Sequence, residues 1–321
     1  MLRAPFGRHT WMLGLLVLAS APLAAQARVA TVDAVRLRAT PAATGAAVRT
    51  LDIAMPLTVE GAATGEWVRV RTADGARGWV RRDLTVPYDA ANPLPALRRI
   101  TARSVAQEQA PFATRARLVN VLTDAAAAAT APAAKGELGL LRLRALQKAL
   151  DEHARTAPGG SEARPLRDGR IRADSSELAY GEPQGQWYVD ADAFWALQRR
   201  YRALPIGEAI AWEAATQQLP GECEGDPTCL FGLAEITVAR YLSLYPRGAH
   251  APAALRRMVE VLGWVEEQSR TSEARFCTKT GAEYTVKAER IAALGRTVNA
   301  SAGAAKARAA ALIRTLAGRC T

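Results

Sequence analysis

The hydrophobic periodicity of this chain changes near residue 90, and no other feature constrains the fold as strongly. Before that point apolar and polar residues alternate, around Val35 and Leu37 and again around Val68 and Val70, which is the period of half-buried β-strands. Beyond it, apolar residues recur three and four positions apart in Ala-, Leu- and Arg-rich segments, which is the period of α-helices. Two regions of different structural class are therefore predicted.

The alternating region is short and is divided by turn signals. The alternation returns around Leu57 and Val59 and near Trp79 and Val80. Turn-forming residues stand between these segments, namely Pro41, Gly45, Gly61, Gly65 and the Asp74-Gly75 pair. Short strands at this spacing, over about 60 residues, indicate a small β-barrel.

Three segments of this region resemble, in the same order, the motifs of bacterial SH3 (SH3b) domains. Residues 35–41 (VRLRATP) resemble the strand and turn that open the domain, residues 65–71 (GEWVRVR) its central G-x-W strand, and residues 75–80 (GARGWV) its G-x-x-G-W-V ending. The resemblance covers residues 30–86 and departs at Ala39, where the family often has a small polar residue. It implies a non-catalytic barrel that binds peptidoglycan peptides or other extended ligands in a shallow surface groove.

Aromatic and arginine side chains of the barrel are the candidates to line that groove. Aromatic rings can pack on a ligand, and guanidinium groups can bind its carboxylates. The candidates are Arg36, Arg38, Trp67, Arg69, Trp79 and Tyr88. The alternative is that both tryptophans pack inside the barrel and the arginines are solvated, because a barrel this small needs large apolar residues in its core.

The rest of the chain is predicted to be helical. Three prolines between Pro87 and Pro95 mark a linker at residues 89–96. Helices are expected over residues 97–129, 137–157, 206–219, 230–245, 251–268 and 283–316, with a further helix that begins at Asp190 as its N-cap. The segment from Ala239 to Leu255 resembles one tetratricopeptide hairpin, although an antiparallel bundle or an irregular solenoid explains it equally well.

The predicted fold is thus multidomain. A small SH3-like all-β barrel at residues 28–88 precedes an all-α domain, a helical bundle or irregular solenoid, at residues 97–321.

The first 27 residues have the pattern of a secretory signal peptide. Arg3 and Arg8 precede an apolar stretch from Trp11 to Leu18, and small residues then lead to Ala25-Gln26-Ala27. The apolar stretch is shorter than the roughly 20 residues that span a bilayer. Cleavage after Ala27 and a periplasmic or secreted location are therefore expected, with an uncleaved anchor as the alternative.

The charge of the chain is basic. The formal net charge is +11, and it falls to +9 when the two arginines of the signal peptide are removed. For an exported protein this charge favours acidic envelope material over nucleic acid: peptidoglycan carboxylates, anionic lipid headgroups or lipopolysaccharide phosphates. Compositional bias of an Ala- and Arg-rich chain is the alternative explanation.

All four cysteines lie beyond residue 220, at Cys223, Cys229, Cys277 and Cys320. An even number in an oxidising compartment indicates two disulfides, for which three pairings exist. The turn-forming insert Glu-Gly-Asp-Pro-Thr favours pairing Cys223 with Cys229, which leaves Cys277 for Cys320. Zinc sites need C-x₂-C spacing with nearby His, and both are absent here. No metal and no cofactor is therefore predicted.

The sequence contains no recognisable catalytic motif. Beyond the signal peptide its only histidines are His153 and His250, both expected at the surface, and there is no H-E-x-x-H or G-x-S-x-G. A cluster of Glu222, Glu224 and Asp226 could supply carboxylates for glycoside hydrolysis. Between two cysteines, however, this cluster is more typical of a solvated turn or of an acidic tip for a basic or metal partner.

Together these features predict an exported, non-catalytic envelope protein without a transmembrane segment. The barrel would recognise the cell wall or a partner, and the helical domain would be a scaffold or bind another envelope protein. Two alternatives stay open: a carboxylate-dependent peptidoglycan-modifying enzyme, and a structural module whose barrel only packs against its own helices.

Overall fold

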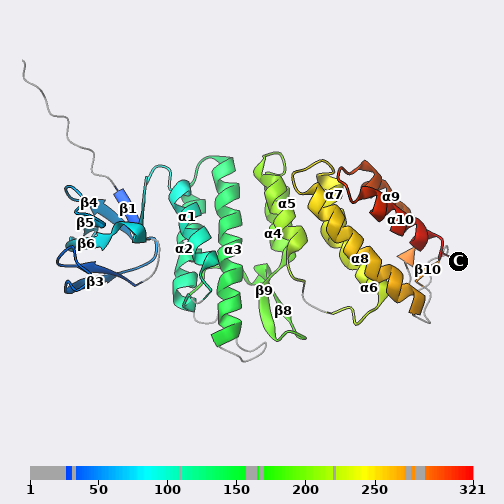
Figure 1. Ribbon diagram of the computed structural model, residues 1–321, viewed down its shortest axis with the longest axis horizontal. Coiled ribbons are helices and arrows are strands. Elements are labelled where there is room, and N and C mark those ends of the chain that lie inside the picture. The colour runs from blue at the N-terminus through cyan, green and yellow to red at the C-terminus, as the bar shows by residue number, and fades with distance from the viewer. Residues whose placement is uncertain are drawn as a thin grey trace, which may run out of the picture.

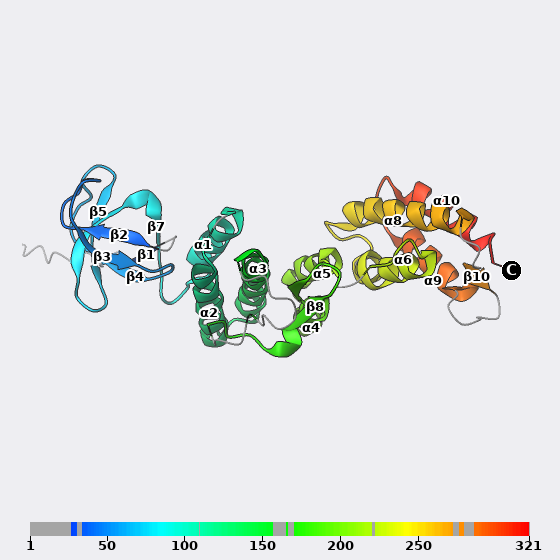
Figure 2. The ribbon, with the colours of Figure 1, turned by 90° about the horizontal axis from the view of Figure 1, so that it is seen from below.

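The computed structural model describes residues 27–30, 34–108, 110–156, 165, 170–219, 222–271, 276–278 and 286–320. The molecule is elongated, with the barrel at one end and the helices following one another along the long axis (Figures 1 and 2). Of the predicted signal peptide only Ala27 lies within the described residues.

The N-terminal region is an antiparallel sheet in the order β3-β2-β6-β5-β4-β1-β7. Its strands are β1 Ala27–Ala30, β2 Val35–Arg38, β3 Ala47–Leu51, β4 Pro56–Val59, β5 Trp67–Thr72, β6 Arg77–Arg81 and β7 Thr85–Pro87. The inward positions hold small and aliphatic residues: Ala30, Val35, Leu37, Leu51, Leu57, Val68, Val70 and Val80. This arrangement confirms the predicted SH3-like barrel and its period-two strands.

Three helices follow, α1 Leu94–Ala106, α2 Phe112–Ala128 and α3 Pro132–Thr156. The single helix predicted over residues 97–129 was wrong, because the chain breaks between α1 and α2. The Arg115 side chain is 3% exposed and closes this break. It donates to the carbonyls of Ser104 at 3.2 Å, Gln107 at 2.6 Å and Ala110 at 3.2 Å. The end of α1 thereby gains donors for main-chain carbonyls that a helix terminus leaves unpaired.

A β-hairpin that the sequence did not predict lies between α3 and the next helix. Its strands are β8 Leu178–Gly181 and β9 Gln186–Val189, which pair antiparallel. Tyr188 is buried, whereas Tyr180 and Trp187 are half-buried with ring centroids 5.2 Å apart. Helix α4, Ala191–Tyr201, then begins as predicted, because the Asp190 side chain accepts from the Asp192 amide. Helix α5 spans Ile206–Thr216.

The last part of the chain packs around two long antiparallel segments. Helix α6 Pro227–Ala234 continues through a π-helical turn, Glu235–Ala239, into α7 Arg240–Leu244, and α8 spans Ala251–Thr271. The short strands β10 Cys277–Thr278 and β11 Val286–Lys287 precede α9 Ala288–Ala300 and α10 Lys306–Ala317. The helix predicted over residues 283–316 is therefore two helices.

Two disulfides hold this last part together. Cys223 pairs with Cys229, and Cys277 pairs with Cys320. Both predicted pairings are confirmed. In the described part of the chain no helix is both long enough and apolar enough to cross a membrane.

The barrel contacts the helices through the side that carries β1 and β7. Val29 and Ile53 of the barrel belong to the same buried cluster as Leu97 and Ile100 of α1. Two polar contacts cross the same boundary, an ion pair between Arg117 and Asp52 at 3.1 Å and a bond from Arg103 Nη1 to the Asp83 carbonyl at 2.8 Å. The barrel is therefore docked on the first helices rather than joined to them by a linker alone.

Candidate ligand-binding surface

The outer face of strands β2, β5 and β6 carries five of the six candidate groove residues. Val68 and Val70 point into the barrel core, so the alternating neighbours Trp67 and Arg69 point outward. The same alternation on β6 places Trp79 on this face, because Val80 is buried. On β2 it places Arg36 and Arg38 there. We call this surface the Arg/Trp face.

Strand register brings an aromatic ring between two guanidinium groups. Trp79 on β6 is the register partner of Arg38 on β2 and of Arg69 on β5. In the next row Trp67 is opposite Arg81. Directly opposed residues in antiparallel strands have Cβ atoms about 5 Å apart, so Trp79 has an arginine on either side along the row.

Two arginines of the Arg/Trp face have no partner in the described part of the chain. The side chains of Arg36 and Arg69 are exposed and make neither an ion pair nor a hydrogen bond with any described residue. Arg38 donates from Nη1 to the Gly45 carbonyl at 2.6 Å, a bond that leaves its charge uncompensated. These three guanidinium groups are thus free to bind an anion.

The remaining arginines of the face are neutralised by carboxylates. Glu60 accepts from Arg71 at 3.0 Å and from Arg77 at 3.2 Å. Burial alone would raise the pKa of Glu60, but the hydrogen bonds from Arg77 and Arg71 hold it below its usual value. The hydrogen bond from Arg81 likewise lowers the pKa of Asp83. Sequence reasoning missed Arg71, Arg77 and Arg81, although the outward positions of the alternating pattern already contained them.

Gly78 lets β2 and β6 approach closely enough to form the row around Trp79. A Cβ atom at this position would lie 2.6 Å from the Arg38 carbonyl oxygen and 2.8 Å from Leu37 Cγ. The turn before it needs Gly75, whose φ of +90° favours glycine. The glycines of the 75–80 motif therefore set the geometry of the Arg/Trp face directly.

Comparison with known families identifies the family of the barrel. Residues 31–86 match the family model described as a bacterial SH3 domain. The barrel is a bacterial SH3 domain. No curated protein and no solved structure matches the chain. The family match ends before the helices, so the tetratricopeptide-like hairpin of α7 and α8 stays a resemblance.

The sixth candidate, Tyr88, is not part of the Arg/Trp face of the SH3 domain. It follows β7, which is separated from β5 by β4 and β1 in the sheet. Its ring packs against the cluster that contains the helices. Tyr88 therefore belongs to the contact between the SH3 domain and the helical region, and a sequence pattern without tertiary information could not separate these two surfaces.

The tryptophans do not pack inside the SH3 domain, contrary to the alternative considered from the sequence. Trp67 and Trp79 are half-buried and lie outside the barrel's core, whose described residues include no aromatic side chain. They are also absent from the cluster shared with α1. Both rings thus keep an accessible edge or face on the Arg/Trp face.

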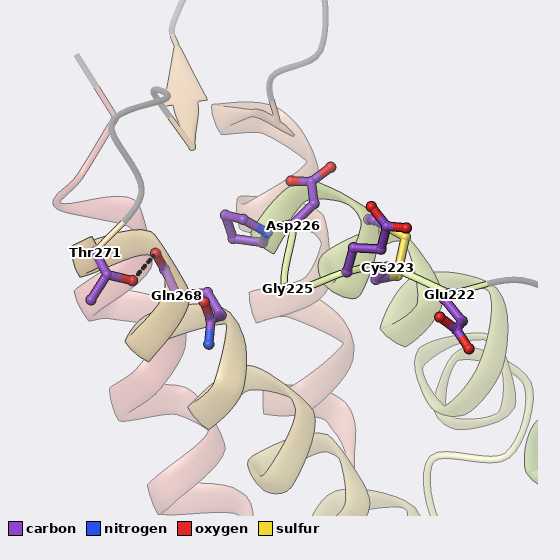
Figure 3. Close-up of a pocket in the computed structure, with 9 residues that line it drawn as sticks. Glu222, Cys223, Gly225, Asp226, Gln268 and Thr271 are labelled. Atoms are coloured by element: carbon purple, nitrogen blue, oxygen red, sulfur yellow. Dashed lines mark hydrogen bonds between the residues drawn. A yellow bond between two sulfur atoms is a disulfide. The ribbon is translucent and has the colours of Figure 1, made fainter.

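The acidic loop around the first disulfide lines an open pocket of about 740 Å³ in the helical region (Figure 3). Glu222 and Asp226 point away from each other on either side of the loop. Asp226 is the N-cap of α6 and accepts from the Thr228 amide at 2.8 Å. Among the described residues no group of three or more His, Cys, Asp or Glu side chains is placed to hold a metal ion.

The two histidines that were expected at the surface, His153 and His250, each lie against an aromatic ring. His250 stacks on Trp212 with ring centroids 4.9 Å apart, and His153 lies 5.4 Å from Phe112. Each is half-buried. His153 lies near the end of α3, and His250 lies in the turn before α8.

Proposed function

We propose that this protein is an exported, non-catalytic envelope protein whose SH3 domain binds acidic cell-wall material on the Arg/Trp face. The observation that carries the proposal is the row Arg38, Trp79 and Arg69. An aromatic ring flanked by guanidinium groups can pack on an extended ligand while the arginines bind its carboxylates in forked geometry. Peptidoglycan stem peptides combine an extended backbone with carboxylates.

The way the SH3 domain docks on α1 supports a ligand-binding role of the domain over a purely structural one. The contact with the helices uses the β1 and β7 side, through Val29, Ile53 and Tyr88. The Arg/Trp face is formed by β2, β5 and β6 and takes no part in it. A barrel that served only as packing would have no need for the exposed side chains of Arg36 and Arg69, which no described residue pairs.

The helical region, in this proposal, is a scaffold that presents the SH3 domain and binds a protein partner in the envelope. Two disulfides stabilise its far end, which suits a protein outside the reducing cytoplasm. The carboxylates of Glu222 and Asp226 point apart, which favours a non-catalytic role for this pair, because glycoside hydrolysis needs two carboxyl groups that face one substrate.

Retention on purified peptidoglycan sacculi tests the proposal. We expect the chain from residue 28 onward to be retained, and Trp79→Ala and Arg69→Gln each to weaken retention roughly tenfold, as loss of a central contact does. Matched controls come from α8: Trp264→Ala removes a tryptophan that is 60% exposed, and Arg256→Gln removes an exposed arginine.

The controls should be retained like the unmodified chain. Equal retention of all four variants would contradict binding by the Arg/Trp face. Retention no greater than that of an unrelated protein of the same net charge would contradict wall binding altogether and would direct attention to a protein ligand.

A further inference from the structure

A second candidate site lies in the helical region, in a pocket of about 330 Å³ between α1, α3 and α5. These three helices follow one another along the long axis of the molecule (Figure 2). Each contributes one stripe of side chains at helical spacing. The stripes are Arg98, Thr101, Ala102 and Val105 from α1, Leu141, Arg144, Gln147 and Lys148 from α3, and Glu213 from α5 with Gln217 directly after it.

The hydroxyl of Thr101 is the observation that points to a ligand. Thr101 is 1% exposed, and its Oγ1 has no hydrogen-bond partner within the described part of the chain. Helical threonines usually donate to the carbonyl four residues earlier, as Thr123 does to Val119 and Thr216 to Trp212. A buried polar atom without a partner is costly and needs an explanation.

The unused N–H donors of the cations in the pocket select the class of ligand. Arg98, Arg144 and Lys148 line it with one carboxylate, Glu213. Each cation has one carboxylate partner, which is Glu137 for Arg98, Glu213 for Arg144 and Asp151 for Lys148. Arg144 uses Nε and Nη2 on Glu213, so that among the described residues its Nη1 has no partner. The Lys148 ammonium makes one bond, to Asp151 at 3.0 Å. A guanidinium donor and ammonium protons are therefore available for an incoming anion.

The apolar part of the lining favours an organic anion over an inorganic one. Val105 is exposed at 36%, and Ala102 and Leu141 are the other apolar residues of the lining. Small-molecule sites begin at about 300 Å³, so the pocket admits a short segment only. The unpaired hydroxyl of Thr101 can both donate and accept, as a peptide group requires.

We infer that this pocket binds a short acidic peptide, with its carboxylate at Arg144 and Lys148, a small apolar side chain against Val105, and a main-chain group at Thr101. The site is separate from the Arg/Trp face and does not depend on it. It would let the helical region recognise an acidic peptide end or segment of a partner on its own.

Methyl NMR on the disulfide-bonded chain from residue 28 tests the inference, because the methyl groups of Val105 and Leu141 report on the pocket itself. The probes are acetyl-Val-Glu as the free acid and its neutral counterpart, acetyl-Val-Gln amide. We expect the acid to shift both methyl resonances saturably at millimolar concentration. The neutral peptide should bind at least tenfold more weakly.

Variants separate recognition from structure. Thr101→Val keeps the shape of the side chain and removes the hydroxyl; it should weaken binding of the acid about fivefold, the loss of one hydrogen bond, without lowering thermal stability. Arg98→Gln should weaken it as well, whereas Arg99→Gln removes an exposed charge from the same helix outside the pocket and should not.

Three results would overturn the site: no shift of the Val105 and Leu141 resonances with the acid, equal binding of acid and neutral peptide, or equal losses in the Arg98 and Arg99 variants. Repeating the titration with Trp79→Ala should change nothing, which keeps this outcome distinct from that of the sacculus experiment.

Discussion

In the SH3 domain the tryptophans Trp67 and Trp79 lie on the outer face over an aliphatic core, whereas the helical region buries several of its large aromatics, with Trp195 at 2% exposure and Phe231 at 0%. Arginines differ in the same way. Arg69 on the barrel is exposed and has no partner among the described residues, but Arg115 in the helical region is buried and bonded to main-chain carbonyls.

The difference shows that residue type alone does not reveal a binding surface in an arginine-rich chain. A guanidinium that satisfies main-chain carbonyls holds the fold together, and one that no described residue neutralises is available to a ligand. The same holds for aromatic rings inside a core and outside it. Substitutions of one kind made in both regions should therefore have opposite consequences.

The largest expected effect comes from replacing one arginine in each region by methionine. Arg115→Met leaves the carbonyls at the end of α1 without donors, and we expect it to lower the free energy of unfolding by about 3 kcal/mol. Arg69→Met should change it by less than about 0.5 kcal/mol while weakening retention on sacculi. Urea unfolding followed by hydrogen exchange in α1 and α2 measures the first quantity.

Similar losses of stability in both variants would break the distinction drawn between the two arginines. Reduced retention of the Arg115 variant on sacculi, at a temperature where it is folded, would also contradict the distinction, because Arg115 would then contribute to ligand binding.

A smaller effect is expected from glycine-to-alanine substitutions. Gly78→Ala places a Cβ 2.6 Å from the Arg38 carbonyl oxygen and should cost about 2 kcal/mol by forcing β2 from β6. It should also weaken sacculus binding, because Arg38 and Trp79 share that row. In α8, a Cβ on Gly263 meets nothing within 4 Å, so Gly263→Ala should stabilise by up to about 1 kcal/mol.

Thermal unfolding of both variants checks the opposite signs. If Gly78→Ala did not lower the thermal stability, β2 and β6 could accommodate a Cβ atom between them. The close approach of the two strands would then not be what aligns the Arg/Trp face.

Local signals in the sequence were sufficient for much of the fold. The three SH3 motifs predicted the barrel, Asp190 predicted the start of α4, and the insert between Cys223 and Cys229 predicted a disulfide. Each of these features is decided by residues that are close in sequence. The break before α2 was missed because helical periodicity continues on both sides of it, and only the buried contacts of Arg115 show where the chain turns.

The candidate sites depended more on tertiary structure. Composition and alternation indicated Arg38, Arg69 and Trp79 separately. Their alignment in one row depends on the register of three strands, and this register cannot be read from the sequence. Tyr88 was wrongly grouped with them because its side of the sheet is set by packing on the helices. The pocket around Thr101 is lined by residues of three helices, so no local sequence pattern predicts it.

The smallest expected effect is the response of the two regions to acid. Hydrogen bonds from Thr72 and then Arg49 lower the pKa of Asp74, and a bond from Arg81 lowers that of Asp83. A carboxyl whose folded pKa lies below its unfolded value of about 4 stabilises the fold above that value, and the contribution is lost as the pH falls through the folded pKa. These pairs are exposed, so each contributes little and is screened by salt.

The hydrogen bonds of Arg115 go to main-chain carbonyls, which do not titrate. The contacts of the helical region that depend on Arg115 should therefore respond to acid less than the ion pairs of the SH3 domain. Going from neutral pH to about pH 3 should lower the hydrogen-exchange protection factors, which are corrected for the intrinsic pH dependence of amide exchange, in β5 and β6 more than at the break between α1 and α2. Asp83→Asn should remove part of that pH dependence from the SH3 domain and none from the helices. An unchanged pH profile in the Asp83 variant would show that the ion pair with Arg81 is not formed in solution, and the Arg/Trp face would then carry one more uncompensated arginine.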